Sequence, residues 1–355
     1  MKILILTNNP NSGSVKKLVT AGQRRGHEMI IHDPTDLVPF ISSTKSGHDG
    51  MFTKNNEGNI ERLYSSHYDV IIPRLSGQSF AYGCAMLQHF SSNLHVPVTS
   101  EALALQIAAN KFSSHQAFSI SKVRTIPSLF VNKPTDFKFI VDKLGLPLVT
   151  KTPLGSQGSG VFILSDELSI STTLSAFSRI NRNLILQKFI DTGSPKSDLR
   201  VFIVDGEIVA SYRRWALAED FRSNYSLSHS GEKVKLSKEE EEMSIQAATA
   251  VGLPGVCGVD IARDSTDNDK PYIIEANGNP SLEGVTAVTG VNVAREIIIY
   301  AEKIGRKQKE KSKADSEAEG NQQPQTLSLK ELVEENNRNW PAIFSKIREK
   351  GLTNT

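Results

Sequence analysis

Two acidic residues lie inside apolar, strand-like runs towards the end of the globular sequence. Asp260 follows "VCGV", and Glu275 follows "YII" with Asn277 two positions further on. A carboxylate in an apolar run is costly unless a cation or hydrogen bonds compensate it. Side chains alternate along a strand, so Glu275 and Asn277 share a face, and the short connection "RDSTDNDKPY" lets the two strands pair as neighbours.

Three oxygen-bearing side chains placed together in this way form a candidate site for a hard cation. Carboxylates and an amide carbonyl suit Mg²⁺, which keeps water and phosphate oxygens as its other ligands. The alternative is an internal acidic pair held by hydrogen bonds.

A glycine-rich segment, "LGSQGSG", connects two strand-like runs. It lacks the Gly-Lys-Ser/Thr of a Walker loop and the following helix of a Rossmann fingerprint. A strand-loop-strand flap is the arrangement that covers phosphates in kinase-like folds. Gly158 lies in this segment, and Lys151 precedes it on a strand from which an ammonium reaches phosphates beneath the flap. A plain turn and a solvated surface lysine are the alternatives.

Arginines form the third group of candidates: Arg200, Arg213, Arg214 and Arg222 lie in and after a predicted β-hairpin. Planar guanidinium groups stabilise phosphoryl or carboxylate charge in a closing site. A basic surface stripe has the same appearance in a sequence, and the spacing does not decide between Arg213 and Arg214.

Composition excludes several other classes of protein. The 355 residues carry a net charge of +2, so no global basic field indicates a nucleic-acid or membrane partner. The two cysteines, Cys84 and Cys257, have no CxxC spacing, and there is no HExxH or GxSxG motif. No apolar run is long enough for a membrane span or a secretory signal. We expect a soluble, cytoplasmic protein.

The elements that must position these residues alternate between strand and helix at first. A strand at 2–6, a helix containing Val15 and Leu18, and strands near 28–32 and 69–75 predict a parallel α/β domain over residues 1–95.

The second part of the sequence, residues 96–305, predicts a mixed α+β body. Helices are expected near 101–118 and 136–145, and strands near 147–152 and 184–190. Asp205-Gly206 predicts the turn of a hairpin, and a capping box formed by Ser237 and Glu240 predicts the start of a helix.

The last fifty residues differ in composition from the body. Residues 306–326 have almost no apolar content, which predicts a disordered linker, and residues 327–355 predict an amphipathic helical tail. The tail is expected either to dock on the body or a sister subunit, or to bind a partner.

Taken together, the motifs resemble the ATP-grasp superfamily, and most closely the RimK-type α-L-glutamate ligases. The resemblance covers about residues 1–300 and rests on the segments "KTPLGSQGSGV", "LILQKFI", "SDLRVFIVDGEIVASYRR", "DFRSN", "GVDIAR" and "IIEANGNPSLEG". It implies a pre-ATP-grasp α/β domain followed by a two-lobed ATP-grasp domain, with a small lid lobe at about 125–187 and a larger lobe at about 188–305.

The resemblance also implies roles for individual residues. ATP would lie between the lobes, with its phosphates at Lys111 and Lys151, its adenine at Lys188 and Phe189, and its ribose at Asp198. The segment that holds Arg222, Ser223 and Asn224 would contact the nucleotide and the acyl phosphate. The metal ligands would be Asp260, Glu275 and Asn277, for two Mg²⁺ or Mn²⁺ ions, and Arg213 and Arg222 would steady the acyl phosphate.

The implied reaction is amide formation. ATP phosphorylates a carboxylate, and an amine then displaces phosphate. The expected amine is an amino acid, glutamate, and the expected acceptor is a peptide, protein or small-molecule carboxylate. Relatives of this kind are commonly homo-oligomers. A ligase for another amine or metabolite, and a non-catalytic ATP-binding scaffold, are the alternatives. The segment "NGNPSLEG" stands where relatives more often have "NASPGLEG", which bears on substrate identity.

Overall fold

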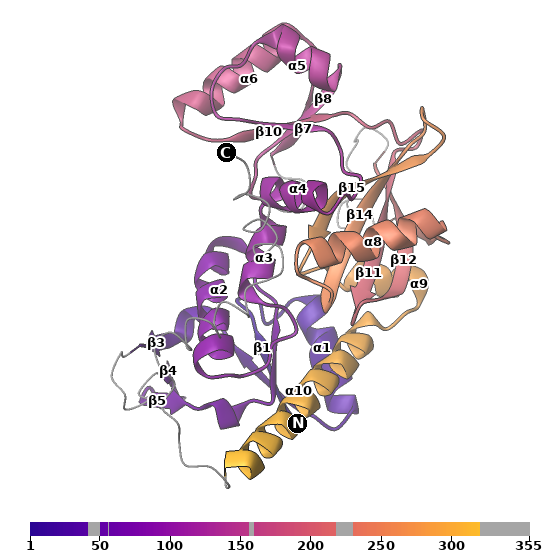
Figure 1. Cartoon of the computed structure of the whole chain (residues 1–355). Helices are drawn as coiled ribbons and strands as arrows, with labels where there is room; N and C mark the ends of the chain where they lie inside the picture. The colour runs from indigo at the N-terminus through magenta and orange to yellow at the C-terminus, as the bar shows by residue number, and fades with distance from the viewer. Residues whose placement is uncertain (42–49, 56, 156–159, 218–229, 320–355) are drawn as a thin grey trace, which may run out of the picture. The chain divides into compact units, whose positions relative to one another are not determined.

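The computed structural model describes residues 1–41, 50–55, 57–155, 160–217 and 230–319. By the contacts between residues, Met1–Gly305 form one compact unit, and a second unit begins at Arg306. Figure 1 shows the elements of the chain, and the sheets described below all belong to the first unit.

The N-terminal residues form the expected parallel α/β layer. Strand β1 (Lys2–Leu6) lies between β2 (Glu28–His32) and β6 (Val70–Pro73), and both pairings are parallel. Helix α1 (Gly13–Arg24) begins where the Ser12 side chain accepts a hydrogen bond from the backbone of Val15. Helix α2 (Phe80–Gln88) follows, and an isolated parallel bridge joins Ile71 to Val98.

A small antiparallel sheet in this region was not predicted from the sequence. It contains β3 (Val38–Phe40), β4 (Gly50–Lys54) and β5 (Ile60–Leu63). Met51 and Leu63 pair in register and are buried in the main core, so this sheet extends the N-terminal layer. Short helical turns accompany these elements: η1 (Pro34–Asp36), η2 (Ser65–His67), η3 (Gly77–Ser79) and η4 (His89–Asn93).

The helix expected near 101–118 is two helices, α3 (Ala102–Ala109) and α4 (Lys111–Ile120). Asn110 has an extended backbone, and its side chain accepts hydrogen bonds from the backbone of Phe112 and Ser113. An asparagine that caps the second helix ends the first one.

The lid lobe is an antiparallel sheet in the order β7 (Ser128–Val131), β10 (Leu184–Lys188), β8 (Leu148–Lys151) and β9 (Val161–Leu164). Helices α5 (Phe137–Leu144) and α6 (Glu167–Arg179) cover one face of it (Figure 1) and share an apolar core with Ile140, Ile170 and Leu186. The predicted strand-loop-strand flap is therefore present as β8 and β9.

The larger lobe is a five-stranded antiparallel sheet. Its strands, in order, are β13 (Gly231–Lys233), β12 (Glu207–Trp215), β11 (Ser197–Val204), β14 (Val256–Asp264) and β15 (Lys270–Asn277). Asp205 and Gly206 both have positive φ, as the predicted two-residue hairpin turn requires. Helix α8 (Lys238–Ala250) packs on one face through Met243 and Ala247, and α9 (Glu283–Thr289) follows β15.

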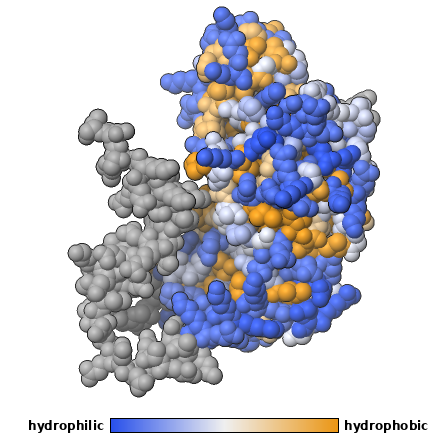
Figure 2. Space-filling model, turned by 45° about the vertical axis from the view of Figure 1, so that its right-hand side comes forward, coloured by the Kyte–Doolittle hydropathy of each residue, from blue (hydrophilic) through white to orange (hydrophobic). Residues whose placement is uncertain are grey.

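Helix α10 (Val293–Glu319) corrects the expected linker, because residues 306–319 are helical in the structure. The segment is rich in Lys, Glu, Ala and Gln, which favour helices, and has no glycine or proline between Gly305 and Gly320. The remaining linker residues and the predicted tail at 327–355 lie outside the described residues. Among the helices of the described part, none is long and apolar enough to cross a membrane. Figure 2 shows a largely hydrophilic surface that is interrupted by smaller hydrophobic patches.

Candidate active site

The acidic residues that opened the sequence analysis lie opposite each other in neighbouring strands. Strands β14 and β15 are antiparallel, with Asp260 paired to Glu275 and Gly258 paired to Asn277. Residues that are directly opposite in a sheet share a face, so the three side chains project from the same side. A bulge after Asp260 places Ile274 on this face as an additional residue.

Asp260 is buried and held by two arginines. Arg200 binds both of its carboxylate oxygens, with 2.7 Å between Nη2 and Oδ2, and the Arg214 Nη2 lies 2.8 Å from the same Oδ2. Burial acts to raise the pKa of Asp260, but the charges and hydrogen bonds of the two arginines outweigh burial and hold that pKa below its ordinary value. Asp260 is therefore ionised at neutral pH.

Asp198 belongs to the same network. Arg214 donates to it through Nε at 2.6 Å and through Nη2 at 2.5 Å, and both residues are buried. Asp198, Arg200, Arg214 and Asp260 thus form one alternating row of acids and bases across β12, β11 and β14.

Arg213 lies on the other face of the sheet. It pairs in register with Leu199, its nearest carboxylate is Glu232 at 3.6 Å, and its guanidinium stacks on Trp215 at 5.1 Å. The choice of Arg213 over Arg214 as the arginine beside the acidic strands is therefore wrong in this structure. A bulge after Phe202 shifts the register of β12 by one residue, so Arg214 takes the position opposite Asp198.

Lys151 and Lys111 lie close to this row of charges. Lys151 ends β8 and is only 6% exposed, and the carboxylates of Glu275 and Asp260 are within electrostatic reach of its ammonium. Burial lowers the pKa of Lys151 to about 8; the nearby Lys111 acts in the same direction, whereas Glu275 and Asp260 oppose it. Lys111, the first residue of α4, donates from Nζ to the carbonyl of Gly155 at 2.8 Å, at the start of the flap.

A buried histidine that the sequence analysis did not single out joins the lid to the larger lobe. His115 Nδ1 lies 2.6 Å from Thr125 Oγ1, which donates to the Ile273 carbonyl, and Gln187 Nε2 lies 3.1 Å from His115 Nε2. Burial, reinforced by Lys151, lowers the pKa of His115 to about 3, so this histidine is neutral. Its isolated position in the sequence carried no signal of this role.

The residues expected at the adenine lie at the end of β10. Lys188 is exposed and donates its backbone N–H to the Pro127 carbonyl at 3.0 Å, while Phe189 is half-buried beneath Lys196. Next to them lies a small apolar cluster made of Ile126, Ile190, Ala262, Tyr272 and Ile274. Its members on β14 and β15 share the face of Asp260 and Glu275, so an apolar surface adjoins the charged row.

The oxygens on this face fit a hard cation in their chemistry. No described cluster contains three or more His, Cys, Asp or Glu side chains suited to a metal, which is consistent with a set of two carboxylates and one amide. Asn277 Oδ1 accepts one hydrogen bond, from the Asn279 backbone at 2.8 Å. Asp260 accepts three N–H groups, and a carboxylate offers about four lone-pair sites. Each donor therefore retains capacity for a metal.

Four of the predicted site residues cannot be placed in this arrangement. Gly158, Arg222, Ser223 and Asn224 lie outside the described residues.

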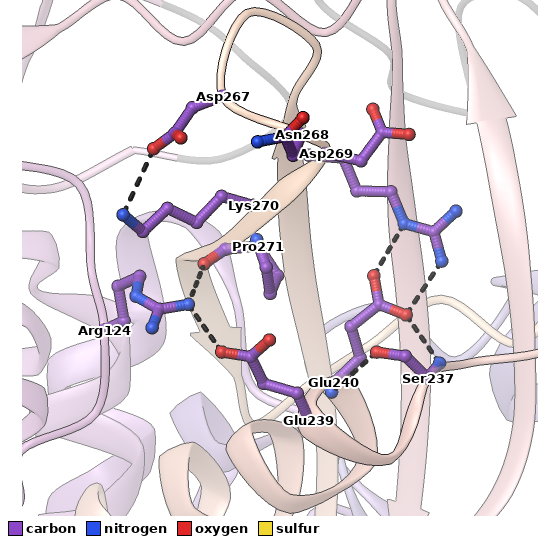
Figure 3. Close-up of a pocket in the computed structure, with 10 residues that line it drawn as sticks. Arg124, Ser237, Glu239, Glu240, Asp267, Asn268, Asp269, Lys270 and Pro271 are labelled. Carbon is purple, nitrogen blue, oxygen red and sulfur yellow. Dashed lines mark hydrogen bonds and ion pairs between the residues drawn. The ribbon is translucent and has the colours of Figure 1, made fainter.

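A pocket at the far end of β14 and β15 has a different character. Figure 3 shows it between the start of α8 and the turn that connects the two strands. Its charges are already paired: Arg124 with Glu239 at 2.6 Å, Arg263 with Glu240 at 2.6 Å, and Lys270 with Asp267 at 3.1 Å. We interpret these contacts as structural, since Arg124 also fastens the segment leading into the lid to the Pro271 carbonyl.

The fold and the charged face define an ATP-grasp enzyme, and comparison with known proteins identifies the family. Residues 1–105 match the RimK pre-ATP-grasp domain, and residues 108–301 match the RimK-like ATP-grasp domain. The chain belongs to the RimK-like ATP-grasp family and is an ATP-dependent ligase. The expected fold class is confirmed. The junction of the two matched regions lies beyond residue 95, where the sequence analysis placed the first boundary.

Similar proteins include probable α-L-glutamate ligases. The chain is 34% identical over 306 residues to one from Shewanella pealeana, covering 85% of this chain and 63% of that protein. It is 33% identical over 306 residues to one from Pseudomonas paraeruginosa, covering 86% of this chain and 96% of that protein.

Solved structures show the same fold at low sequence identity. The ATP-grasp ligase PsnB, in complex with a phosphomimetic variant of its minimal precursor, Mg and ADP, has a TM-score of 0.63 at 14% identity, with 85% of this chain and 98% of that chain covered. D-alanine–D-alanine ligase from Bacillus anthracis, in complex with ATP, has a TM-score of 0.59 at 19% identity, with 88% and 99% covered.

Proposed function

We propose that this protein joins the amino group of L-glutamate to a carboxylate of a peptide or protein, with Mg-ATP as the second substrate. The relatives named as probable α-L-glutamate ligases support the choice of amino acid. PsnB is described with its precursor, which supports an acceptor of peptide type.

One observation carries the nucleotide part of the proposal. A buried lysine from the lid, Lys151, lies within electrostatic reach of two carboxylates of the larger lobe, Asp260 and Glu275. A buried ammonium and a set of hard oxygen donors are what a triphosphate with its divalent metal requires. The apolar cluster around Ile190 and Tyr272 offers an adjoining surface for a flat base.

The metal site is proposed to use Asp260, Glu275 and Asn277. Mg²⁺ there would neutralise the charge of the transferring phosphoryl group. Mn²⁺ has the same preference for oxygen ligands and is expected to substitute for it. We propose two ions, because carboxylates that lie opposite each other can bridge a pair of metals.

The chain's own residues would bind and orient the reactants. Lys111 and Lys151 would hold the phosphates from the side of the flap. Arg200 and Arg214 would fix Asp260 and leave an electropositive floor on which an acyl phosphate is stabilised as the substrate carboxylate attacks the γ-phosphate. The amine then displaces phosphate, so no protein nucleophile is required and positioning supplies most of the rate enhancement.

The direct test is to incubate the protein with Mg-ATP, L-glutamate and a pool of acidic peptides. We expect ADP release that depends on both co-substrates, and a peptide product whose mass has increased by one glutamyl residue. Omitting Mg²⁺ is the control and should abolish both signals.

Two outcomes would contradict the proposal. A product that contains another amino acid would retain the ligase class and reject glutamate. Tight ATP binding with no turnover in any pool would favour a non-catalytic nucleotide-binding role.

A further inference from the structure

A second polar site lies where the N-terminal parallel sheet meets the loop after β15. Asn8 follows the carboxyl end of β1, and Arg74 follows that of β6, with the Arg74 N–H donating to the Leu6 carbonyl at 2.8 Å. In open α/β sheets, ligands bind outside the carboxyl ends of the strands. The position of both residues therefore suits a ligand.

Arg74 has no acidic partner among the described residues. It is 7% exposed, and its one side-chain hydrogen bond in that part of the chain runs from Nη2 to the Pro280 carbonyl at 2.9 Å. Burial lowers the pKa of Arg74 to about 10, and no neighbouring charge contributes to this shift. Arg200 and Arg214, which are similarly buried, both bind carboxylates. A buried cation without an anion is costly, and a bound carboxylate would offset that cost.

Two buried amide oxygens beside Arg74 also lack partners. Asn8 Nδ2 donates to the Ser76 carbonyl at 3.1 Å, and Asn279 Nδ2 donates to the Leu75 carbonyl at 3.1 Å. These contacts define which amide atom is oxygen, because the reverse assignment would place oxygen against oxygen. The Oδ1 atoms of Asn8 and Asn279 then accept no hydrogen bond within the described structure. Each of them suits an N–H donor.

This site adjoins the candidate active site. The Asn279 N–H donates to Asn277 Oδ1, the proposed metal ligand, at 2.8 Å. Pro280, whose carbonyl binds Arg74, packs so closely on Gly258 that a Cβ at Gly258 would lie 2.7 Å from the Pro280 Cβ and 3.3 Å from the Arg200 Nη1. A molecule held at Arg74 would therefore have its other end near the Arg200–Asp260 pair.

We propose that Arg74 binds the α-carboxylate of the incoming amino acid, and that the unpaired Oδ1 atoms of Asn8 and Asn279 accept hydrogen bonds from its amine. A planar guanidinium and two amide acceptors are complementary to the carboxylate and amine of one α-amino acid. This inference rests on the proposed function and extends it, because it assigns the amino-acid subsite to loops of the N-terminal layer.

The test compares wild type with Arg74→Gln and Arg74→Lys, using L-glutamate and L-isoglutamine, in which the α-carboxylate is an amide. In Arg74→Gln we expect the KM for glutamate to rise by about 10-fold or more, with the KM values for ATP and peptide unchanged within about twofold. Arg74→Lys should recover part of the loss, since it restores charge but not the bidentate fork. Arg295→Gln, which alters an exposed arginine, is the matched control.

Calorimetry on the wild-type protein, loaded with a non-hydrolysable ATP analogue, keeps the test independent of how the variants fold. Glutamate should bind at least about 10-fold more tightly than isoglutamine. Equal binding of the two, an unchanged KM for glutamate in Arg74→Gln, or a rise confined to the KM for peptide would overturn the inference. If wild type forms no glutamyl product at all, the proposed function fails instead, so the two failures are distinguishable.

Discussion

At the scale of single residues, the site is a set of buried charges whose cost is met by their neighbours. Asp198, Arg200, Arg214 and Asp260 compensate one another through bidentate hydrogen bonds. Lys151 is different, because its ammonium has carboxylates within electrostatic reach but no ion pair with them among the described residues. Such a lysine is prepared to receive phosphate oxygens.

The first prediction concerns Lys151 and pH. In the nucleotide-free protein, Lys151 loses its proton as the pH rises through about 8, so affinity for ATP should fall above that pH. Lys151→Met should weaken ATP binding by roughly 10- to 100-fold, the loss of one charge-assisted contact, and should flatten this pH dependence. Titration of a fluorescent ATP analogue on either side of pH 8 measures both effects. Equal affinity of variant and wild type would place the phosphates elsewhere.

The second prediction concerns the metal. Glu275→Gln removes one carboxylate charge at nearly constant size, so Mg²⁺-dependent turnover should fall by ~100-fold or more. The matched control is Glu232→Gln, an exposed glutamate near Arg213 on the other face of the sheet. ADP release at saturating ATP measures the difference. Turnover close to wild type in Glu275→Gln would remove this residue from the proposed metal site.

The sequence predicted some of these placements and not others, for a physical reason. Alternation along strands was enough to put Asp260, Glu275 and Asn277 on one face. It did not distinguish Arg213 from Arg214, because a regular two-residue hairpin would place Arg213 opposite Asp198. The bulge after Phe202 shifts the pairing by one residue. A bulge of this kind has no clear signature in a single sequence.

At the scale of elements, local signals predicted most of the body. The turn at Asp205-Gly206, the end of α5 at Gly145 and the start of α8 at Ser237 lie where turn and capping chemistry places them. The small sheet of β3, β4 and β5 was missed because its strands are short and only partly apolar. The break between α3 and α4 depends on a single asparagine cap within a helical pattern.

The third prediction tests one of these caps. Ser237 Oγ accepts from the Glu240 N–H at 3.2 Å, and the Glu240 carboxylate accepts from the Ser237 N–H at 2.8 Å and binds Arg263. Ser237→Ala should cost about 1 kcal/mol, whereas Ser237→Asp, which retains a capping oxygen, should cost much less. Thermal unfolding with ATP absent measures both. An alanine variant as stable as wild type would show that packing alone positions α8.

At the scale of the whole molecule, the last helix closes the first unit. Residues of α10 that precede Gly305, such as Ile297, Ile298 and Ala301, are buried in a core shared with β1 and α1. Glu302 on the same helix receives Arg25 Nε at 2.5 Å and lies 2.6 Å from His27 Nε2. The hydrogen bond from Arg25 is the main cause that lowers the pKa of Glu302 to about 2.

The fourth prediction follows from this contact and from the division of the chain at Gly305. A chain that ends at Gly305 keeps the buried part of α10, so it should fold and retain ATP-dependent ADP release. Adding Glu302→Gln to that chain should lower its melting temperature near neutral pH. The stabilisation by Glu302 should be lost as the pH falls from about 4.5 towards 2, since a group with a lowered pKa is protonated more readily in the unfolded chain. Aggregation of the shortened chain would show that residues 306–355 belong to the folded core.

The account as a whole depends on a divalent metal held by β14 and β15 beneath a nucleotide bound to Lys151. The most direct measurement is a crystal structure with a non-hydrolysable ATP analogue and Mn²⁺, whose anomalous signal locates the metal without reference to the protein coordinates. We expect an anomalous peak bonded to oxygens of Asp260, Glu275 and Asn277, with the phosphates of the analogue between that peak and Lys151. A peak elsewhere, or a triphosphate that is remote from these side chains, would contradict the account.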